Sequence, residues 1–219
     1  MKSETEMRYI IMCGGSYRGW ETPKHLLRIH GETIVERTIR LLREAGVADI
    51  AISANDPRFE HFGVSVLHHE NRYDVKAYND FEGYWCNAFW PTDEPVCYIF
   101  GDVVFSPAAI RKIVETETDD IEFFASAPPF AKEYRKPWAE PFAFKVVNQQ
   151  HLKEAIQATK EFDLIGLFSR KPLAWEFWNV IKGLDLNGID FSSYTVINDY
   201  TCDIDNQEEI EELRKINTF

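Results

Sequence analysis

Apolar residues come in short runs that alternate with longer segments of helical spacing. Residues 9–12 form a continuous apolar run that ends at two glycines, the pattern of a buried parallel strand leading into a loop. In residues 33–44 the apolar positions, Ile34 among them, fall on one broad face, and Arg37 is expected off that face. Gly46 follows directly, as glycine does after the end of a helix. This second segment is therefore predicted to be an amphipathic helix.

The same alternation continues along the chain, although it is less regular after residue 120. Further strands are predicted at residues 49–53, 64–67, 96–100, 121–127, 142–147 and 194–197. Further helices are predicted at residues 79–89, 106–117, 151–160, 173–181 and 207–215. Strands and helices that alternate with short connections indicate an α/β fold, a three-layer αβα arrangement around a mostly parallel mixed sheet. No boundary between domains is visible, so residues 1–219 are predicted to form a single domain with halves at 1–120 and 121–219.

Composition narrows the functional classes. The chain has 219 residues, of which 45% are hydrophobic, enough for one sizeable core. A net charge of -12 speaks against a broad nucleic-acid surface, and an anionic substrate would need local cations or a metal ion. No secretory signal and no run of the roughly 20 apolar residues that a membrane span requires is seen. The four cysteines form no CxxC pair and are expected to be reduced core residues, which suits the cytoplasm.

The first candidate site is the loop after the first predicted strand. Gly14 and Gly15 let backbone amides approach a ligand, and Arg18 and Lys24 add positive charge. A nucleoside triphosphate needs these features, but a plain strand-to-helix turn with solvated cations has them too. Neither a P-loop nor a dinucleotide-binding fingerprint is present.

Two acidic segments are the other candidates. Asp102 follows a glycine at the end of the predicted strand 96–100, where it could hold magnesium or cap a turn. Asp203 and Asp205 are two positions apart and point the same way if the segment is extended. Either one could complete a magnesium site with Asp102, or both could belong to an acidic helix start. Because ligands bind beyond the carboxyl ends of strands in open α/β sheets, the first loop and Asp102 are expected at one cleft.

Several motifs resemble the GT-A-like nucleotidyltransferases, which include sugar-phosphate nucleotidylyltransferases and phosphocholine cytidylyltransferases. They are Met12-Cys13-Gly14-Gly15, Thr22-Pro23-Lys24, Gly31-Glu32-Thr33-Ile34, Ala45-Gly46-Val47-Ala48-Asp49-Ile50, Gly101-Asp102-Val103-Val104-Phe105 and Cys202-Asp203-Ile204-Asp205. The resemblance covers the first 55 residues well and residues 121–197 weakly. It implies a Rossmann-like GT-A fold, with a nucleotide-binding first half and an acceptor-binding second half.

The resemblance also implies an activity, in which a nucleoside monophosphate passes from a nucleoside triphosphate to a small phosphorylated acceptor. Mg²⁺ is the implied cofactor, CTP is slightly favoured, and sugar phosphates or phosphocholine-like molecules are the implied acceptors. Lys24 would neutralise the transferring α-phosphate, Arg18 would contact the outer phosphates, and Asp102 would hold magnesium with Asp205, or with Asp203 instead. The implied nucleotide contacts are Cys13, Gly14, Gly15, Ser16, Asn71 and Asn87. The implied acceptor contacts are Glu140, Lys145 and Arg170.

One departure from the family pattern lies in the glycine-rich loop, where Tyr17 replaces the third glycine and Arg18 comes one position early. The altered loop suggests one alternative, a non-catalytic nucleotide-binding module, and a GT-A glycosyltransferase that uses a nucleotide-sugar is kept as a second alternative. Three tryptophans could form a cage for a quaternary amine or could simply pack in the core; they are Trp138, Trp175 and Trp178. No nucleic-acid or membrane partner is expected, and the sequence leaves a monomer and a homodimer equally open.

Overall fold

The computed structural model describes residues 7–14, 21–69, 83–127, 139–205 and 207–215. Its centre is a seven-stranded sheet with the order β10-β8-β9-β6-β1-β4-β5. β9 runs antiparallel to both of its neighbours, and the other strands are parallel to one another. The predicted mostly parallel mixed sheet is confirmed.

The bounds of the elements follow. The strands are β1 (Arg8–Met12), β2 (Arg28–Ile29), β3 (Glu32–Thr33), β4 (Ile50–Ser53), β5 (Ser65–Leu67), β6 (Val96–Phe100), β7 (Val103–Val104), β8 (Ile121–Ala125), β9 (Pro141–Val146), β10 (Thr195–Val196) and β11 (Cys202–Asp203). The helices are α1 (Ile34–Glu44), α2 (Pro107–Glu115), α3 (Gln149–Leu164), α4 (Ala174–Lys182) and α5 (Gln207–Leu213), with short 3₁₀ turns η1 (Lys24–Leu26), η2 (Pro57–Phe59) and η3 (Trp85–Ala88).

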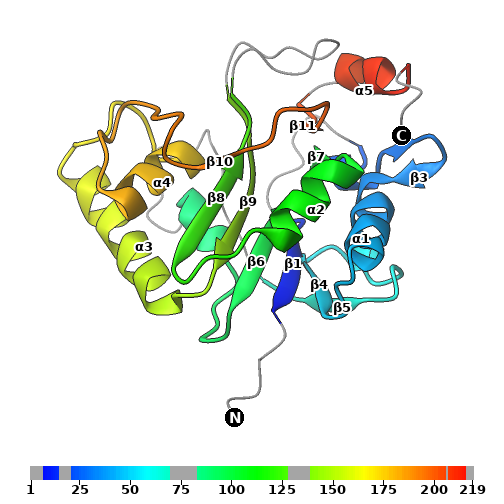
Figure 1. Ribbon diagram of the computed structural model, residues 1–219, viewed down its shortest axis with the longest axis horizontal. Helices are drawn as coiled ribbons and strands as arrows, with labels where there is room; N and C mark the ends of the chain where they lie inside the picture. Colours follow the sequence, from blue (N-terminus) through cyan, green and yellow to red (C-terminus); the bar gives the residue numbers. More distant parts are fainter. Residues whose placement is uncertain (1–6, 15–20, 70–82, 128–138, 206, 216–219) are drawn as a thin grey trace.

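The two faces of the sheet carry separate cores, because successive side chains of a strand point to opposite sides. Tyr9 and Ile11 of β1 pack with α1 and α2, whereas Ile10 packs with α3 and α4. Figure 1 shows α1 and α2 on one side of the sheet and α3 and α4 on the other. The predicted three-layer αβα arrangement is therefore confirmed.

Helix α1 illustrates why the local sequence folds as it does. The Thr33 hydroxyl oxygen accepts a hydrogen bond from the Glu36 amide at 3.1 Å, and the Glu36 carboxylate accepts one from the Thr33 amide at 2.7 Å, which together form a capping box. Gly46 follows the helix with φ at +88°, the left-handed region that favours glycine. The expectation for Arg37 is wrong, since this side chain is buried at 6% exposure on the inner side of the helix.

Chain order places a topological switch point between β1 and β6. After β1 the chain proceeds to β4 and β5 on one side, then returns to β6 on the other side. The carboxyl ends of β1 and β6 flank this switch point, which is where ligands bind in open α/β sheets. Both predicted candidate segments, the loop after Met12 and Asp102, begin at this point.

Some local predictions were wrong. Within the predicted helix 79–89, the described part contains only η3, and both Tyr84 and Phe89 have extended backbones. Aromatic side chains lose rotamer freedom in helices, and here Trp85 and Phe89 pack edge to face at 5.5 Å. The small pairs β2–β3 and β7–β11 were not predicted, because two-residue strands carry no periodicity.

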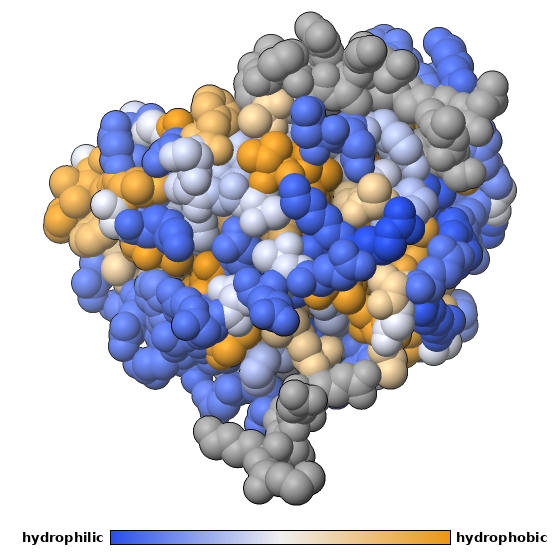
Figure 2. All heavy atoms as spheres, in the orientation of Figure 1, coloured by the Kyte–Doolittle hydropathy of each residue, from blue (hydrophilic) through white to orange (hydrophobic). Residues whose placement is uncertain are grey.

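The visible surface is mainly hydrophilic, with an apolar area at the left edge of Figure 2. The large exposed apolar side chains include Leu164, Ile165 and Leu167 at the end of α3. Patches of this kind are common at contact surfaces, and the homodimer stays a prediction.

Among the described residues, no helix is long and apolar enough to cross a membrane.

Candidate active site

Close packing at Gly101 brings the ends of β1 and β6 together. The Gly101 amide donates to the Met12 carbonyl at 3.0 Å. A Cβ atom at position 101 would lie 2.5 Å from that oxygen, 2.6 Å from the Cys13 Sγ and 2.9 Å from the His25 ring. Only glycine fits this contact, so the glycine before Asp102 allows η1 to pack against the end of β6.

This packing sets Lys24 against Asp102. The Lys24 Nζ lies 2.7 Å from the Asp102 Oδ2, and the two side chains are 23% and 26% exposed. They are 78 positions apart in the chain; Lys24 begins η1, and Asp102 follows β6, one of the two strands at the switch point. The pair is therefore accessible to a ligand at the carboxyl edge of the sheet.

A third group comes from the C-terminal part of the chain. β11 pairs with β7, and the Ile204 amide continues the pairing by donating to the Asp102 carbonyl at 3.1 Å. As a result, Lys24 Nζ donates to the Ile204 carbonyl at 2.8 Å and lies 3.9 Å from the Asp205 Oδ1. We call Lys24, Asp102, Asp205 and the Ile204 carbonyl the charged cluster.

Electrostatics keeps the ion pair charged. Burial alone lowers the pKa of Lys24, but Asp102, followed by Asp203 and Asp205, outweighs burial, and the pKa of Lys24 is raised. Burial likewise raises the pKa of Asp102, yet Lys24 and then His25 outweigh it, and the pKa of Asp102 is lowered. At neutral pH the cluster therefore contains the Lys24 cation paired with the Asp102 anion.

His25 is a functional neighbour that sequence reasoning missed. Its ring is 4% exposed and meets Phe59 edge to face at 5.8 Å. Burial, followed by Lys24, lowers the pKa of His25 to about 4 against the opposing effect of Asp102, so the ring is neutral at pH 7. A histidine directly after Lys24 was the only signal in the sequence, and a neutral ring there adds no second positive charge beside Lys24.

The donor set is suitable for a magnesium ion. Asp102 and Asp205 present carboxylate oxygens on either side of a cation that belongs to the protein itself. Magnesium prefers one or two protein carboxylates and takes its other ligands from water and substrate phosphates. Among the described residues no group of three or more His, Cys, Asp or Glu that could hold a metal ion is found.

Asp203 and Glu140 lie beside the cluster. The Asp203 amide donates to the Glu140 Oε2 at 3.2 Å. Glu140 is 2% exposed and is fixed by Ser126, which accepts from its amide at 2.8 Å. Glu140, predicted as an acceptor contact, thus lies next to β11, which contains Asp203 and leads to Asp205.

The predicted nucleotide contacts are only partly described. The Cys13 side chain is fully buried in the core, and burial, followed by Asp102, raises the pKa of its thiol well above the ordinary value. Gly14 follows it at the switch point. Asn87 lies in η3, where its carbonyl is 2.7 Å from the His69 Nε2. Four predicted residues lie outside the described part of the chain: Gly15, Ser16, Arg18 and Asn71.

Two predicted acceptor contacts are not brought to the charged cluster. Lys145 pairs with Cys97 near the start of β6, at the opposite end of the sheet, and its Nζ donates to the carbonyls of Val114 and Thr116 at 3.0 and 2.6 Å. The prediction for Lys145 is corrected, since this lysine holds the end of α2. Arg170 lies between α3 and α4, where its Nε donates to Glu176 at 2.6 Å.

The tryptophans of α4 pack in the core. Trp175 and Trp178 are 7% and 1% exposed, and their indole N–H groups donate to the Ala139 carbonyl and the Ser193 hydroxyl. Lys182 of the same helix lies 5.0 Å from the centre of the Trp178 ring. The core alternative is therefore confirmed for these two residues, and Trp138 lies outside the described residues.

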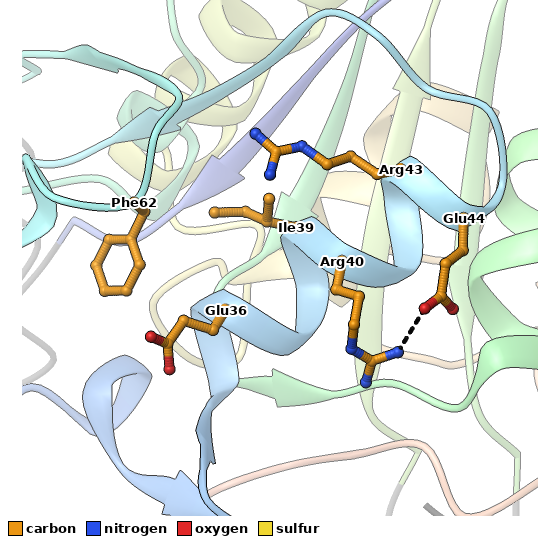
Figure 3. Close-up of a pocket in the computed structure, with 6 residues that line it drawn as sticks. All are labelled: Glu36, Ile39, Arg40, Arg43, Glu44 and Phe62. Carbon is orange, nitrogen blue, oxygen red and sulfur yellow. Dashed lines mark hydrogen bonds and ion pairs between the residues drawn. The ribbon is translucent and has the colours of Figure 1, made fainter.

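A separate surface pocket of about 400 Å³ lies on the outer side of α1. It is lined by Glu36, Ile39, Arg40, Arg43, Glu44 and Phe62, and Figure 3 shows Arg40 turned toward Glu44 along the helix. The Arg40 guanidinium also bonds Glu32, and Arg43 donates to the Gly63 carbonyl at 3.1 Å. None of its lining residues belongs to the charged cluster, so this pocket is distinct from the candidate active site.

Comparisons with known proteins identify the family of the chain and proteins with a similar fold. A family model described as the MobA-like NTP transferase domain matches residues 9–166, more than half of the chain. A structure assigned as a glucose-1-phosphate thymidylyltransferase of Bacillus anthracis, in complex with a sucrose, superposes with a TM-score of 0.60 and 15% identity over 96% of each chain. The inositol-1-phosphate CTP transferase of T. maritima superposes with a TM-score of 0.52 and 16% identity, also over 96% of each chain. No curated protein sequence matches the chain.

Proposed function

The chain belongs to the MobA-like NTP transferase domain family, and on that premise we propose that the charged cluster transfers a nucleoside monophosphate to a small phosphorylated acceptor. The enzyme is a nucleotidyltransferase. CTP is the favoured donor, sugar phosphates and phosphocholine-like molecules are the favoured acceptors, and Mg²⁺ is the proposed cofactor.

One observation carries the proposal: Lys24 Nζ lies 2.7 Å from Asp102 and 3.9 Å from Asp205, at the switch point of the sheet. A lysine head group flanked by two carboxylates supplies what phosphoryl chemistry needs, a cation for the phosphate and oxygen ligands for a metal ion. Because these groups come from three distant parts of the chain, their convergence is not explained by local structure.

The proposed reaction is an in-line displacement. An oxygen of the acceptor phosphate attacks the α-phosphorus, the new phosphorus–oxygen bond forms, and the bond to the bridging β-phosphate oxygen breaks. Pyrophosphate leaves with the electron pair. The attacking oxygen is already anionic, so no general base is required, and catalysis consists of positioning and charge neutralisation.

Lys24 has the central role in this scheme. In the structure its amino group is bound by Asp102 and the Ile204 carbonyl. When the α-phosphate binds, we expect Lys24 to turn from Asp102 to the phosphate and to neutralise the charge that develops there. Asp102 and Asp205 would hold the magnesium ion, which when bound supplies Lewis-acid polarisation of the phosphate.

The identity of the two substrates rests on weaker support. The T. maritima neighbour is named as a CTP transferase and the Bacillus anthracis neighbour as a thymidylyltransferase, and both names contain a sugar or cyclitol 1-phosphate. Glu140, buried beside Asp203, is the residue we propose for contact with acceptor hydroxyl groups. Family membership favours nucleotidyl transfer over both a glycosyltransferase and a non-catalytic nucleotide-binding module.

Isotope transfer tests the proposal directly. The protein is incubated with Mg²⁺ and α-³²P-labelled CTP, UTP, GTP or ATP, together with glucose 1-phosphate, inositol 1-phosphate or phosphocholine. We expect the α-label in a nucleotidyl-acceptor product, and in parallel reactions with γ-³²P-labelled nucleotides we expect the γ-label in pyrophosphate. A γ-label found on the acceptor, or consumption of a nucleotide-sugar instead, would contradict the reaction.

A matched pair of lysine variants assigns the activity to the cluster. Lys24→Met should lower the transfer rate by about 10²–10³-fold, the usual cost of losing one electrostatic contact to the transition state. Lys153→Met is the control, because Lys153 also pairs with an aspartate, Asp93, but on an exposed part of α3. Equal rates in the two variants would remove Lys24 from the mechanism.

A further inference from the structure

A network of hydrogen bonds fastens the turn before β11 to the start of α2. The Ser106 amide donates to the Thr201 Oγ1 at 3.0 Å, and the Ser106 hydroxyl donates to the Asp199 carboxylate. The Thr201 amide donates to the other oxygen of Asp199 at 2.7 Å. The turn 199–201 is therefore held from both its backbone and its side chains.

Arg37 holds this turn from the other side. It lies on α1 at 6% exposure, its Nε donates to the Phe105 carbonyl at 3.0 Å, and its Nη2 donates to the Tyr200 hydroxyl at 3.3 Å. The planar guanidinium fork fixes two acceptors at once with little loss of freedom per bond. One arm thus binds the chain just after β7, and the other binds the turn just before β11.

The two segments that Arg37 joins lead directly into the charged cluster. Phe105 follows β7, which itself follows Asp102, and Tyr200 precedes β11, which leads to Ile204 and Asp205. β7 and β11 are only two residues long, and their register pairs Asp203 with Val103. So short a ladder defines its register weakly by itself.

We propose that Arg37 is a positioning residue for the reaction centre, which fixes β11 against β7 and thereby sets the distance between Asp205 and Asp102. The inference rests on the function proposed above, since it assumes that these two aspartates hold the metal ion. Residues that orient metal ligands typically change metal affinity or activity by about 10–100-fold when they are replaced. Arg37 acts through the backbone and touches no substrate.

A role limited to stability would give a different result from a positioning role. If Arg37 only stabilises the fold, its loss lowers the free energy of unfolding but leaves the metal affinity of the folded molecules unchanged. If it positions Asp205, the metal affinity of folded molecules falls as well. The two roles are separated by measuring metal binding and unfolding on the same variants.

The experiment measures Mn²⁺ binding by electron paramagnetic resonance in the presence of CTP, UTP, GTP or ATP, and unfolding in urea. The variants are Arg37→Met, Arg37→Lys and Tyr200→Phe. Arg43→Met is the matched control, because Arg43 lies on the same helix and also donates to a backbone carbonyl, that of Gly63. We expect Mn²⁺ binding weakened about 10–100-fold in Arg37→Met, partly restored in Arg37→Lys and unchanged in Arg43→Met.

Tyr200→Phe removes one arm of the contact without removing a buried charge, so it decides the question if Arg37→Met does not fold. We expect a smaller weakening of Mn²⁺ binding in Tyr200→Phe than in Arg37→Met, in the same direction. Wild-type affinity in both variants would overturn the positioning role and leave the proposed function intact. Absence of nucleotide-dependent Mn²⁺ binding in the wild type would overturn the proposed function and the positioning role together.

Discussion

Two groups of side chains stand out in this chain, the charged cluster and the aromatic cluster of α4, which comprises Trp175, Phe177 and Trp178. In the charged cluster Lys24, Asp102 and Asp205 keep 23%, 26% and 45% of their side chains exposed. In the aromatic cluster the three residues are 7%, 0% and 1% exposed. The charged residues and the two tryptophans were candidates for ligand binding, and only the charged residues remain accessible to a ligand.

The difference lies in where the binding groups of each cluster are directed. The α4 rings pack against the sheet, with the ring centre of Phe123 at 5.1 Å from that of Trp175 and 5.3 Å from that of Trp178, and the two indole N–H groups are bonded within the protein. The groups of the charged cluster instead meet at the carboxyl edge of the sheet, where a ligand can reach them. Convergence of polar groups at an open edge is thus a better sign of function here than aromatic content.

The largest expected effect is that of Trp178→Ala, which should destabilise the fold without changing catalysis. Removal of this buried ring is expected to lower the free energy of unfolding by about 3–5 kcal/mol, measured in urea. The transfer rate per folded molecule should stay within about twofold of the wild type. Phe191→Ala is the control, because Phe191 is 45% exposed and its loss should cost less than about 0.5 kcal/mol. A large rise in the acceptor KM of Trp178→Ala would return this residue to a binding role.

His25 should make the free energy of unfolding depend on pH. Its pKa is lowered from 6.5 to about 4 by burial. Between these values the unfolded chain binds more protons, so the free energy of unfolding should fall as pH is lowered from 6.5 to 4. The expected loss is on the order of 3 kcal/mol, and full stability is present above pH 6.5.

Urea unfolding at several pH values measures this slope, with His25→Phe as the test variant. The phenyl ring can keep the edge-to-face contact with Phe59 but cannot be protonated. Its stability should therefore change much less between pH 6.5 and 4. Asp102 contributes below this window, because its pKa is lowered by Lys24 and His25. A wild-type slope in His25→Phe would assign the pH dependence to other groups.

The smallest expected effect distinguishes Asp203, which lies in β11, from Asp205, which lies two residues later. Asp205→Asn should raise the Mg²⁺ concentration needed for half-maximal transfer by about tenfold or more, since Asp205 lies 3.9 Å from Lys24 Nζ. Asp203→Asn should have a weaker effect, because the Asp203 backbone is tied to Glu140. The reverse order would make Asp203 the metal ligand. The assay is initial transfer rate against Mg²⁺ concentration for both variants.

Sequence predicted the elements with strong periodicity or clear caps. β6 was predicted at its observed bounds, and α2 begins after Ser106, whose hydroxyl accepts from the Ala109 amide at 2.9 Å. Glycine spacing and the resemblance together predicted Lys24 and Asp102, which do lie together. The helix cap and the strand depend on residues that are close in the chain, so a local pattern contains them, whereas Lys24 and Asp102 were predicted from the resemblance and from their places after neighbouring strands.

What the sequence did not predict depends on contacts between distant segments. The pairing of β11 with β7, the burial of Arg37 and the turn of Lys145 toward α2 each join residues far apart in the chain. Arginine and lysine side chains are mostly exposed in proteins, so the burial of Arg37 and Lys145 contradicts the usual pattern. Both are buried because their head groups find backbone carbonyls, which no local spacing reveals.

Asp102 is proposed to bind magnesium together with a nucleoside triphosphate. Measuring the free energy of unfolding in the presence of both ligands tests this directly. The free energy of unfolding is measured for the wild type and Asp102→Asn with CTP, UTP, GTP or ATP, each with and without Mg²⁺. One nucleotide at about 100 times its Kd should stabilise the wild type by about 2.7 kcal/mol with Mg²⁺, and by much less without it. Asp102→Asn should lose this magnesium-dependent gain. An equal gain in Asp102→Asn, or no gain with any nucleotide in the wild type, would contradict the account.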